Sequence, residues 1–239
     1  MWEVSNNKVL HCMSEEVYTC KYCEKSFKRE STLAVHMCEP KKRHRERNEK
    51  GVQLGMQAYL KFYEYTQGSA KTKTYDDFAK SPYYKAFVKF GRYCVSINAI
   101  NIPRFINYVI QNNKKLDYWA SDKIYTEYLE DLLYKENATD ALARAIEFSI
   151  KWGEEHNALP CDVVRHGNDN ATCYNITTGK ISAWVLYNSV SGQQFLGRIS
   201  EEQRRLIWDY INPEKWAKIL EKYPADQEYV HSILDQAGW

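Results

Sequence analysis

The chain has 239 residues, a 44% hydrophobic content and a formal net charge of +2 at pH 7. These values allow a hydrophobic core and exclude both a disordered tail and a polyelectrolyte that would bind nucleic acid along its whole length. The first residues lack the apolar core of a signal peptide, and eighteen apolar residues never occur in a row. We therefore expect a soluble cytoplasmic protein without a membrane partner.

The chain is expected to begin with an extension, residues 1–17, before its first folded element. Met13 would make a natural alternative start, so residues 1–12 are interpreted as dispensable. Among the seven cysteines, Cys94, Cys161 and Cys173 are scattered without disulfide spacing and are expected to be buried or half-buried thiols.

Residues 18–40 have the spacing of a small ββα zinc finger. Cys20 and Cys23 are separated by two residues, and twelve more residues separate Cys23 from His36. Phe27 and Leu33 lie where such a module needs its two apolar side chains. The sequence therefore predicts a ββα module that holds one structural Zn²⁺.

The fourth ligand of this module departs from the usual pattern, because Pro40 occupies a position where a second histidine or cysteine is common. The candidates are Cys38 and His44. Cys38 can reach the metal only if the helix unwinds after His36, and Pro40 favours such unwinding by disfavouring a helical Glu39. His44 would have to fold back across three cations. We favour Cys38 and keep His44 as the alternative.

A basic segment follows the module, and residues 41–66 are predicted to form a basic linker helix that is regular from about 43 to 65. Residues 21–50 contain ten Lys or Arg and five Glu, which gives a local charge of +5. Apolar residues then recur at helical intervals from Val52 onward. The positive charge of the chain is therefore concentrated at this end.

The remainder is predicted to be a helical domain at 67–158 and a C-terminal helical subdomain at 159–239. In the first, Ser81-Pro82 starts a helix that covers about 83–97, and further helices are expected at about 103–113, 121–134 and 138–155. Ser121 is expected to cap the third of these helices and Thr139-Asp140 the fourth.

Between about 159 and 180 the helical pattern gives way to an irregular loop, in which residues 173–176 are expected to form a strand. Helices resume after Ser182, at a capping box formed by Ser200 and Gln203, at Asn212-Pro213, and from Asp226 to Gly238. The fold class is therefore mainly α: a small N-terminal ββα module followed by an all-helical body.

Motifs that would indicate an enzyme are absent from the sequence. It contains no Gly-rich phosphate loop, no GxGxxG, no GxSxG and no HExxH. Its carboxylate pairs are adjacent in sequence, which spreads them apart on a helix. We expect a non-enzymatic protein, with a metal-dependent nuclease assembled from distant acids as the remaining enzymatic option.

The finger helix places four residues where a major groove could be read: Arg29, Ser31, Thr32 and Val35. Arg29 is suited to a guanine edge and Thr32 to a thymine methyl group. Phosphate contacts are expected from Lys25, Lys28, Lys41, Lys42, Arg43, Arg45 and Arg47. Further along the chain, Lys85, Lys89 and Arg92 recur at i, i+4, i+7 and so share one helix face.

Residues 18–36 resemble the C2H2 zinc-finger family. The helical remainder resembles DNA-replication accessory proteins of T4-type tailed phages, such as the helicase loader. The resemblance rests on the aromatic-rich sequences of residues 81–90 and 206–211 and on the size of the chain. This second resemblance implies forked or single-stranded DNA and another replication protein as partners, and the host cytoplasm as location. It transfers no site residue.

These observations predict a zinc-containing, non-enzymatic accessory protein that binds duplex, forked or single-stranded DNA in viral replication or transcription. The finger and the basic helix would contact DNA, and the helical body would recruit a partner protein. The alternative is a protein-interaction or assembly adaptor whose finger is purely structural.

Overall fold

The computed structural model describes residues 17–68 and 73–239, and the predicted extension before Val17 lies outside these ranges. The described chain is mainly helical with one two-stranded sheet, which confirms the expected fold class. It divides into two compact units, with the boundary between Val95 and Ser96. We call them the first and second units. In the described ranges, no helix combines the length and apolar character required to cross a membrane.

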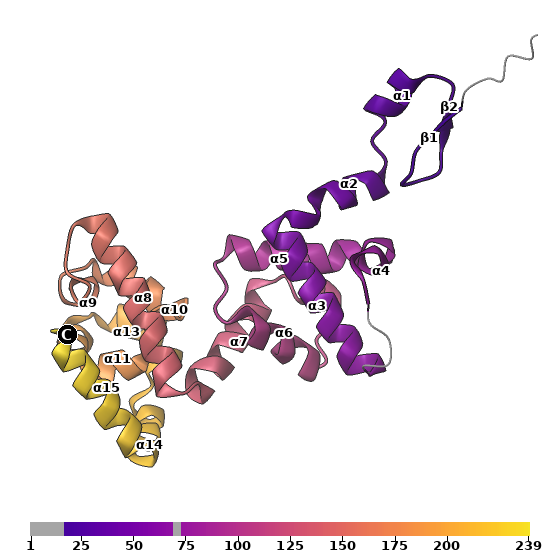
Figure 1. Ribbon diagram of the computed structural model, residues 1–239. Helices are drawn as coiled ribbons and strands as arrows, with labels where there is room; N and C mark the ends of the chain where they lie inside the picture. Colours follow the sequence, from indigo (N-terminus) through magenta and orange to yellow (C-terminus); the bar gives the residue numbers. More distant parts are fainter. Residues whose placement is uncertain (1–16, 69–72) are drawn as a thin grey trace, which may run out of the picture. The chain divides into compact units, whose positions relative to one another are not determined.

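The first unit begins with the expected ββα module, here defined as residues 18–38 (Figure 1). Its two strands pair antiparallel, with Tyr18 opposite Phe27 and Thr19 opposite Ser26. The elements of this unit are β1 (Tyr18–Thr19), β2 (Ser26–Phe27), α1 (Glu30–Val35), α2 (Glu39–Arg45), the 3₁₀ helix η1 (Glu46–Asn48), α3 (Lys50–Gln67), α4 (Tyr75–Lys80) and α5 (Tyr84–Ser96).

The single helix expected at about 43–65 is wrong, because the chain breaks between α2 and α3. Residues 46–48 form one 3₁₀ turn, and Glu49 is extended with φ −65° and ψ 131°. Both Glu46 and Glu49 form ion pairs with Arg92 of α5, at 3.4 and 2.8 Å. The break thus coincides with contacts to a residue far away in sequence, which local helical periodicity does not report.

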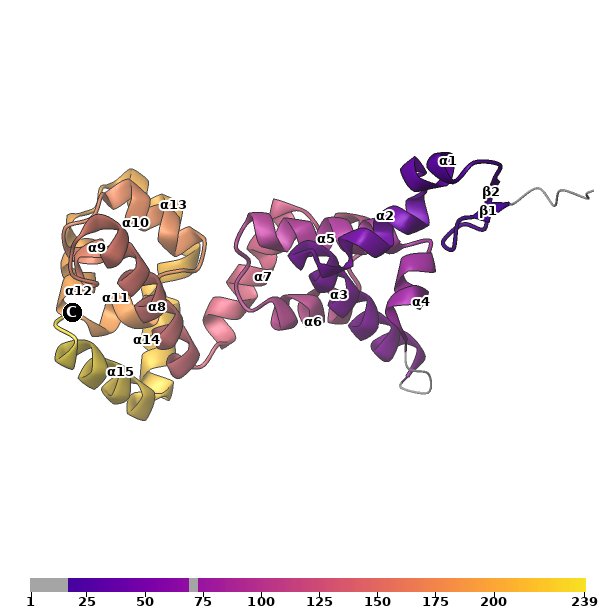
Figure 2. The ribbon, with the colours of Figure 1, turned by 45° about the horizontal axis from the view of Figure 1, so that its top comes forward.

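Helices α3 and α5 cross at very short range (Figures 1 and 2). A methyl group added at Gly91 would lie 2.0 Å from the Gly51 carbonyl oxygen and 2.6 Å from the Gly55 nitrogen. Glycines on both helices are therefore what allows the two backbones to touch. Beside this crossing lies an aromatic cluster, in which Tyr59 contacts Phe78 and Phe87 with ring centroids 5.2 and 5.6 Å apart.

The second unit is wholly helical in its described residues. Its elements are α6 (Ile102–Gln111), the 3₁₀ helix η2 (Leu116–Tyr118), α7 (Asp122–Lys135), α8 (Ala138–His156), α9 (Asp162–Arg165), α10 (Asp169–Thr177), α11 (Ala183–Asn188), α12 (Val190–Arg198), α13 (Glu201–Ile211), α14 (Pro213–Lys222) and α15 (Pro224–Gln236). Helix α8 packs against α9, α11 and α15, and α10 packs against α13. The expected boundary at 158/159 therefore falls inside a packed unit.

Large aromatic side chains fill the second unit. Trp184 and Trp216 meet edge to face with centroids 5.6 Å apart, and Phe105 stacks on Tyr128 at 4.7 Å. A buried ion pair supports this packing: the Arg144 guanidinium donates to both carboxylate oxygens of Glu136, at 2.6 and 2.7 Å. These contacts place large aromatic side chains at the centre of the core, while Tyr118, Tyr174 and Tyr229 are exposed. The thiols of Cys94, Cys161 and Cys173 are buried, as expected.

The prediction of an irregular loop with a strand between about 159 and 180 is wrong. This region contains α9 and α10, and residues 173–176 are helical. Asn168 caps α10 by accepting a hydrogen bond from the Ala171 N–H at 3.1 Å. The buried face of α10 consists of Thr172, Cys173 and Ile176, too few apolar residues to produce a helical pattern.

Three of the predicted helix caps are confirmed. Ser121 caps α7, and Ser200 forms the expected capping box with Gln203. Asn212 caps α14 as the Asn-Pro pair indicated. Two predictions are wrong by a few residues: Asn137, not Thr139-Asp140, caps α8, and the last helix begins at Pro224 rather than Asp226.

We predict that Gly91→Ala destabilises the first unit by about 1–3 kcal/mol, because the overpacking against α3 outweighs the gain of about 1 kcal/mol in helix propensity. Denaturant unfolding measures the loss, and hydrogen exchange should quicken in α3 and α5. Gly197→Ala is the control: no atom lies within 4 Å of the added methyl group, so stability should rise by about 0.5–1 kcal/mol. Equal responses of the two variants would contradict the packing argument.

Candidate metal centre and basic surface

The first two candidate ligands, Cys20 and Cys23, lie in the turn between β1 and β2. The Cys20 N–H donates to the Lys25 carbonyl at 2.9 Å, and the Glu24 N–H donates to the Cys20 carbonyl at 2.8 Å. Glu24 closes the turn in the left-handed region, with φ 59°. These backbone bonds turn the chain sharply enough for both sulfurs to face the same side.

The other two candidate ligands lie in the extended link between α1 and α2. Helix α1 ends at Val35, and His36 has φ −65° and ψ 124°. Cys38 is extended as well and is the N-cap of α2. The helix therefore unwinds after His36, as Cys38 ligation requires. A non-helical Glu39 was expected before Pro40, and this is wrong, since Glu39 is the first residue of α2 and Pro40 the second. In the first turn of a helix the N–H that proline lacks would have no partner within the helix, so Pro40 is tolerated there.

The four side chains converge to form a potential metal site. The Cys20 and Cys38 sulfurs are 3.9 Å apart, and the Cys23 sulfur is 3.2 Å from His36 Nε2. One ligand atom from each residue lies within 4.8 Å of all the others. A tetrahedral ion with metal–sulfur bonds of about 2.3 Å requires sulfur–sulfur edges of about 3.8 Å. Three sulfurs and one imidazole at these separations can hold a metal ion.

His44 stays out of this cluster. Its ring packs against Tyr22 with centroids 5.1 Å apart, and the metal-ligand group among the described residues comprises Cys20, Cys23, His36 and Cys38. The geometry therefore selects Cys38 from the two candidates for the fourth position.

The electrostatics of the cluster favour a bound cation. The Tyr22 backbone N–H donates toward the Cys20 sulfur and lowers the pKa of that thiol. The Lys25 N–H also lowers the pKa of Cys23, but burial and the neighbouring Cys38 and Cys20 sulfurs outweigh it, so the net pKa is raised. Thiols this close together do not all lose their protons readily, because the thiolates would repel one another, and a bound dication would compensate that negative charge.

The two apolar side chains expected to support the module do so only partly. Phe27 packs against the His36 ring with centroids 4.8 Å apart, and both Phe27 and Leu33 are half-buried. Helix α1 has no buried residue. Its predicted base-reading residues are exposed, including Arg29 and Thr32, and Val35 exposes 81% of its surface.

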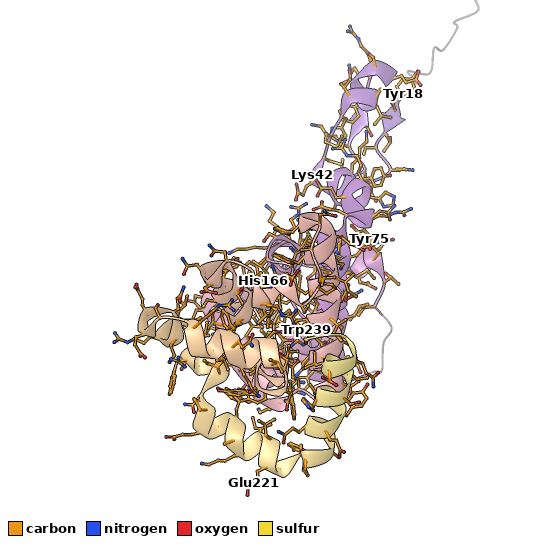
Figure 3. The ribbon with its side chains drawn as sticks, turned by 90° about the vertical axis from the view of Figure 1, so that its left-hand side faces the viewer. Tyr18, Lys42, Tyr75, His166, Glu221 and Trp239 are labelled. Carbon is orange, nitrogen blue, oxygen red and sulfur yellow. The ribbon has the colours of Figure 1, made fainter. Side chains whose placement is uncertain are left out.

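Most of the predicted phosphate-contacting residues are exposed cations: Lys25, Lys28, Lys42, Arg45 and Arg47. Lys42, labelled on α2 in Figure 3, is only 4.0 Å from Glu46 and remains 54% exposed. Lys41 differs, because its ammonium donates to the His36 carbonyl at 2.9 Å and so braces the link between the ligands.

Arg43 is used inside the first unit. Its guanidinium donates to the Ala79 carbonyl at 2.6 Å and lies 4.4 Å from the centroid of the Tyr84 ring. Tyr75 in turn donates its hydroxyl to the Arg43 carbonyl at 2.5 Å. A phosphate contact would have to break these interactions, so we remove Arg43 from the phosphate-facing set. Ala79 and Tyr75 have no sequence feature that reveals this role.

The chain matches no protein-family model, no curated protein and no solved structure. A function can therefore be inferred only from the local geometry and chemistry of the described residues.

We predict that the purified chain binds one metal ion through these four residues. Cys38→Ser should reduce the retained metal to a small fraction of wild type, and His44→Ala should retain it in full. Elemental analysis gives the stoichiometry, and the visible absorption of bound Co²⁺ reports tetrahedral thiolate coordination. Loss of metal in His44→Ala with retention in Cys38→Ser would make His44 the fourth ligand.

We predict that Arg43→Gln destabilises the first unit by about 1–3 kcal/mol, because it removes a charge-assisted hydrogen bond and a cation–π contact. Arg45→Gln removes the same charge from an exposed neighbour and should change stability little. Hydrogen exchange in α4 distinguishes the two: it should quicken in Arg43→Gln alone. Identical exchange in both variants would exclude this role for Arg43.

Proposed function

We propose that the chain is a zinc-containing, non-enzymatic nucleic-acid-binding accessory protein. The observation that carries this proposal is the double position of Cys38, which belongs to the metal-ligand cluster and is also the N-cap residue directly before the basic helix α2. The metal centre and the cations that follow it are thereby parts of one local structure. A base-contacting helix and a phosphate-contacting helix would then act together.

Zinc is the metal that best suits the cluster. Three thiolates and one imidazole in tetrahedral reach form a typical Zn²⁺ ligand set, and such soft ligands disfavour Mg²⁺ and Ca²⁺. All four positions would be filled by protein ligands, which leaves none for a substrate. The role of the ion in this proposal is therefore structural.

Nucleic acid is the partner best suited to the exposed charges. Glu46 and Glu49 form ion pairs with Arg92 of α5, at 3.4 and 2.8 Å, and Glu46 is farther, 4.0 Å, from Lys42, so these carboxylates compensate mainly a cation outside the basic segment. Arg45 of α2 and Arg47 of η1 are exposed, as are Lys28 and Arg29 of the module. A single finger reads about three base pairs, so most of the affinity would come from phosphate contacts. A role in phage DNA replication or transcription, with a protein partner on the helical body, is part of the proposal and rests on resemblance.

The alternative function is a protein-interaction or assembly adaptor with a purely structural metal site. One observation favours it: Val35 and Met37 expose apolar surface next to the metal ligands, at 81% and 48%. Exposed apolar side chains are typical of protein contacts. In this case the same module would bind a protein through its α1 end.

We predict that the full-length, metal-loaded chain binds DNA with roughly micromolar affinity at low salt and that the affinity falls steeply as salt rises. Fluorescence anisotropy with labelled duplex, forked and single-stranded DNA measures this at 50 and 200 mM salt. Arg45→Gln/Arg47→Gln should lower the slope of log K against log salt on duplex by about 1.8, since each phosphate contact contributes about 0.9.

The matched control is Lys123→Gln/Lys218→Gln, which removes the same charge from exposed positions of the second unit. It should leave the slope unchanged. Absence of binding to every DNA at 50 mM salt would rule out the proposed function and favour the adaptor. DNA degradation that requires a divalent metal would instead reveal a nuclease.

A further inference from the structure

A groove of about 350 Å³ lies in the first unit between α2 and α5. Its charged lining residues are Glu39, Lys42, Arg43, Glu46, Lys85, Lys89 and Arg92, and the buried Tyr84 and Val88 also line it. The volume is at the lower end of the range for small-molecule pockets, which are usually apolar. A small charged group suits this groove better than a large apolar ligand.

The lining carries an excess of positive charge. It contains five cations and two carboxylates, a net charge of +3. Two of the cations are engaged within the protein: Arg43 with Ala79 and Glu39, and Arg92 with Glu46 and Glu49. Both carboxylates of the lining thus contact the two arginines. The Lys42 ammonium lies 4.0 Å from Glu46 and its side chain stays 54% exposed, so it can contact a ligand together with Lys85 and Lys89.

Lys85 and Lys89 are exposed, and no ion pair is found for either among the described residues. Helix α5 contains Lys85, Lys89 and Arg92 but no acidic residue. Like charges at i, i+4 cost a helix about 0.2–0.5 kcal/mol per pair, and Lys85 also lies in the first turn, where the helix dipole disfavours a cation. A bound anion would relieve both costs.

We propose that this groove binds a phosphate of a nucleic-acid backbone through Lys42, Lys85 and Lys89. The inference deepens the proposed function and rests on it, because it assigns a second contact to the same nucleic acid. Lysine ammonium groups act as point charges on phosphate and do not read base edges in the planar, bidentate manner of arginine. The groove would therefore add affinity without sequence preference.

The position of the groove relative to the metal centre agrees with this role. Lys42 follows Cys38 by four residues of α2, or about 6 Å along the helix axis. Three base pairs span about 10 Å of duplex. The groove therefore begins within the length of one finger site, at a distance suited to the phosphates next to that site.

The test compares duplex binding by full-length metal-loaded wild type, the groove variant Lys85→Gln/Lys89→Gln and a control, Lys50→Gln/Lys80→Gln. The control removes two exposed cations of the same unit that do not line the groove. In the groove variant the slope of log K against log salt should be smaller in magnitude by about 1.8. The ratio of wild-type to variant affinity should therefore fall about 12-fold between 50 and 200 mM salt. The control should match wild type.

Lysine acetylation footprinting locates the contact directly. Bound DNA should protect Lys85 and Lys89, and Lys80 should react equally with and without DNA. If wild type binds and the groove variant matches the control, with no protection of Lys85 and Lys89, the groove inference is overturned and the proposed function survives. If wild type binds no DNA, both are overturned. Protection by polyglutamate but not by DNA would assign the groove to an acidic protein and also overturn the inference.

Discussion

The convergence of Cys20, Cys23, His36 and Cys38 is the constraint on which the N-terminal module depends. Of the 21 residues of the module, Cys20 alone is buried, and Phe27 and Leu33 are only half-buried, as are Tyr18 and Tyr22. A segment of this size cannot bury enough apolar surface to fold by itself, so small modules rely on disulfides or metals. Ion binding to the four ligands would then supply folding free energy directly.

The same convergence sets the start of the basic helix. Cys38 is the N-cap of α2, and Lys41 reaches back to the His36 carbonyl, so the ligand that closes the cluster also fixes where α2 begins. Loss of the cluster would free this end of α2 as well as the module. The dependence runs in one direction along the chain: the turn and the ligands position α2, and α2 positions Lys42 and Arg43.

The charged residues of the first unit fall into two groups: those that interact within the unit and those that remain exposed. Arg43 is held by Ala79 and Tyr84, and Arg92 draws Glu46 and Glu49 toward α5. Exposed ion pairs of this kind contribute only about 0–1 kcal/mol each, so their main effect is to orient side chains. The cations left exposed, among them Lys42, Arg45 and Arg47, are those on which the proposed nucleic-acid contact depends.

Local signals in the sequence account for most of what was predicted correctly. Ligand spacing located the ββα module and its first three candidate ligands, and Ser121, Ser200 and Asn212 marked helix starts through their side-chain caps. The fourth ligand departs from the usual spacing, and Cys38 was favoured over His44 by the effect of Pro40 on the helix. The failures are cases in which one local signal has two meanings. Asn168-Asp169 resembles a turn, but Asn is equally a helix cap, and the polar sequence of α10 gave no periodicity to decide between them.

Other features depend on partners far away in sequence and were out of reach. The break at Glu49 accompanies the ion pair with Arg92, 43 residues away. The internal role of Arg43 requires Ala79, 36 residues away. Lys85, Lys89 and Arg92 were placed on one helix face correctly, but nothing local showed that α2 lies opposite them across a groove. Charge patterns along a helix thus reveal a face, and only the fold reveals what that face meets.

The arrangement of the first unit has a consequence for recognition in the proposed function. Helix α2 begins directly after the module and lines the groove, so the second contact would follow the first without the entropy cost of closing a flexible linker. The gain would apply to any sequence, because the groove lysines contact charge alone. Base reading would be left to Arg29 and Thr32 over about three base pairs, too short for a unique site. Selectivity must then come from the shape of the nucleic acid or from a protein partner of the helical body.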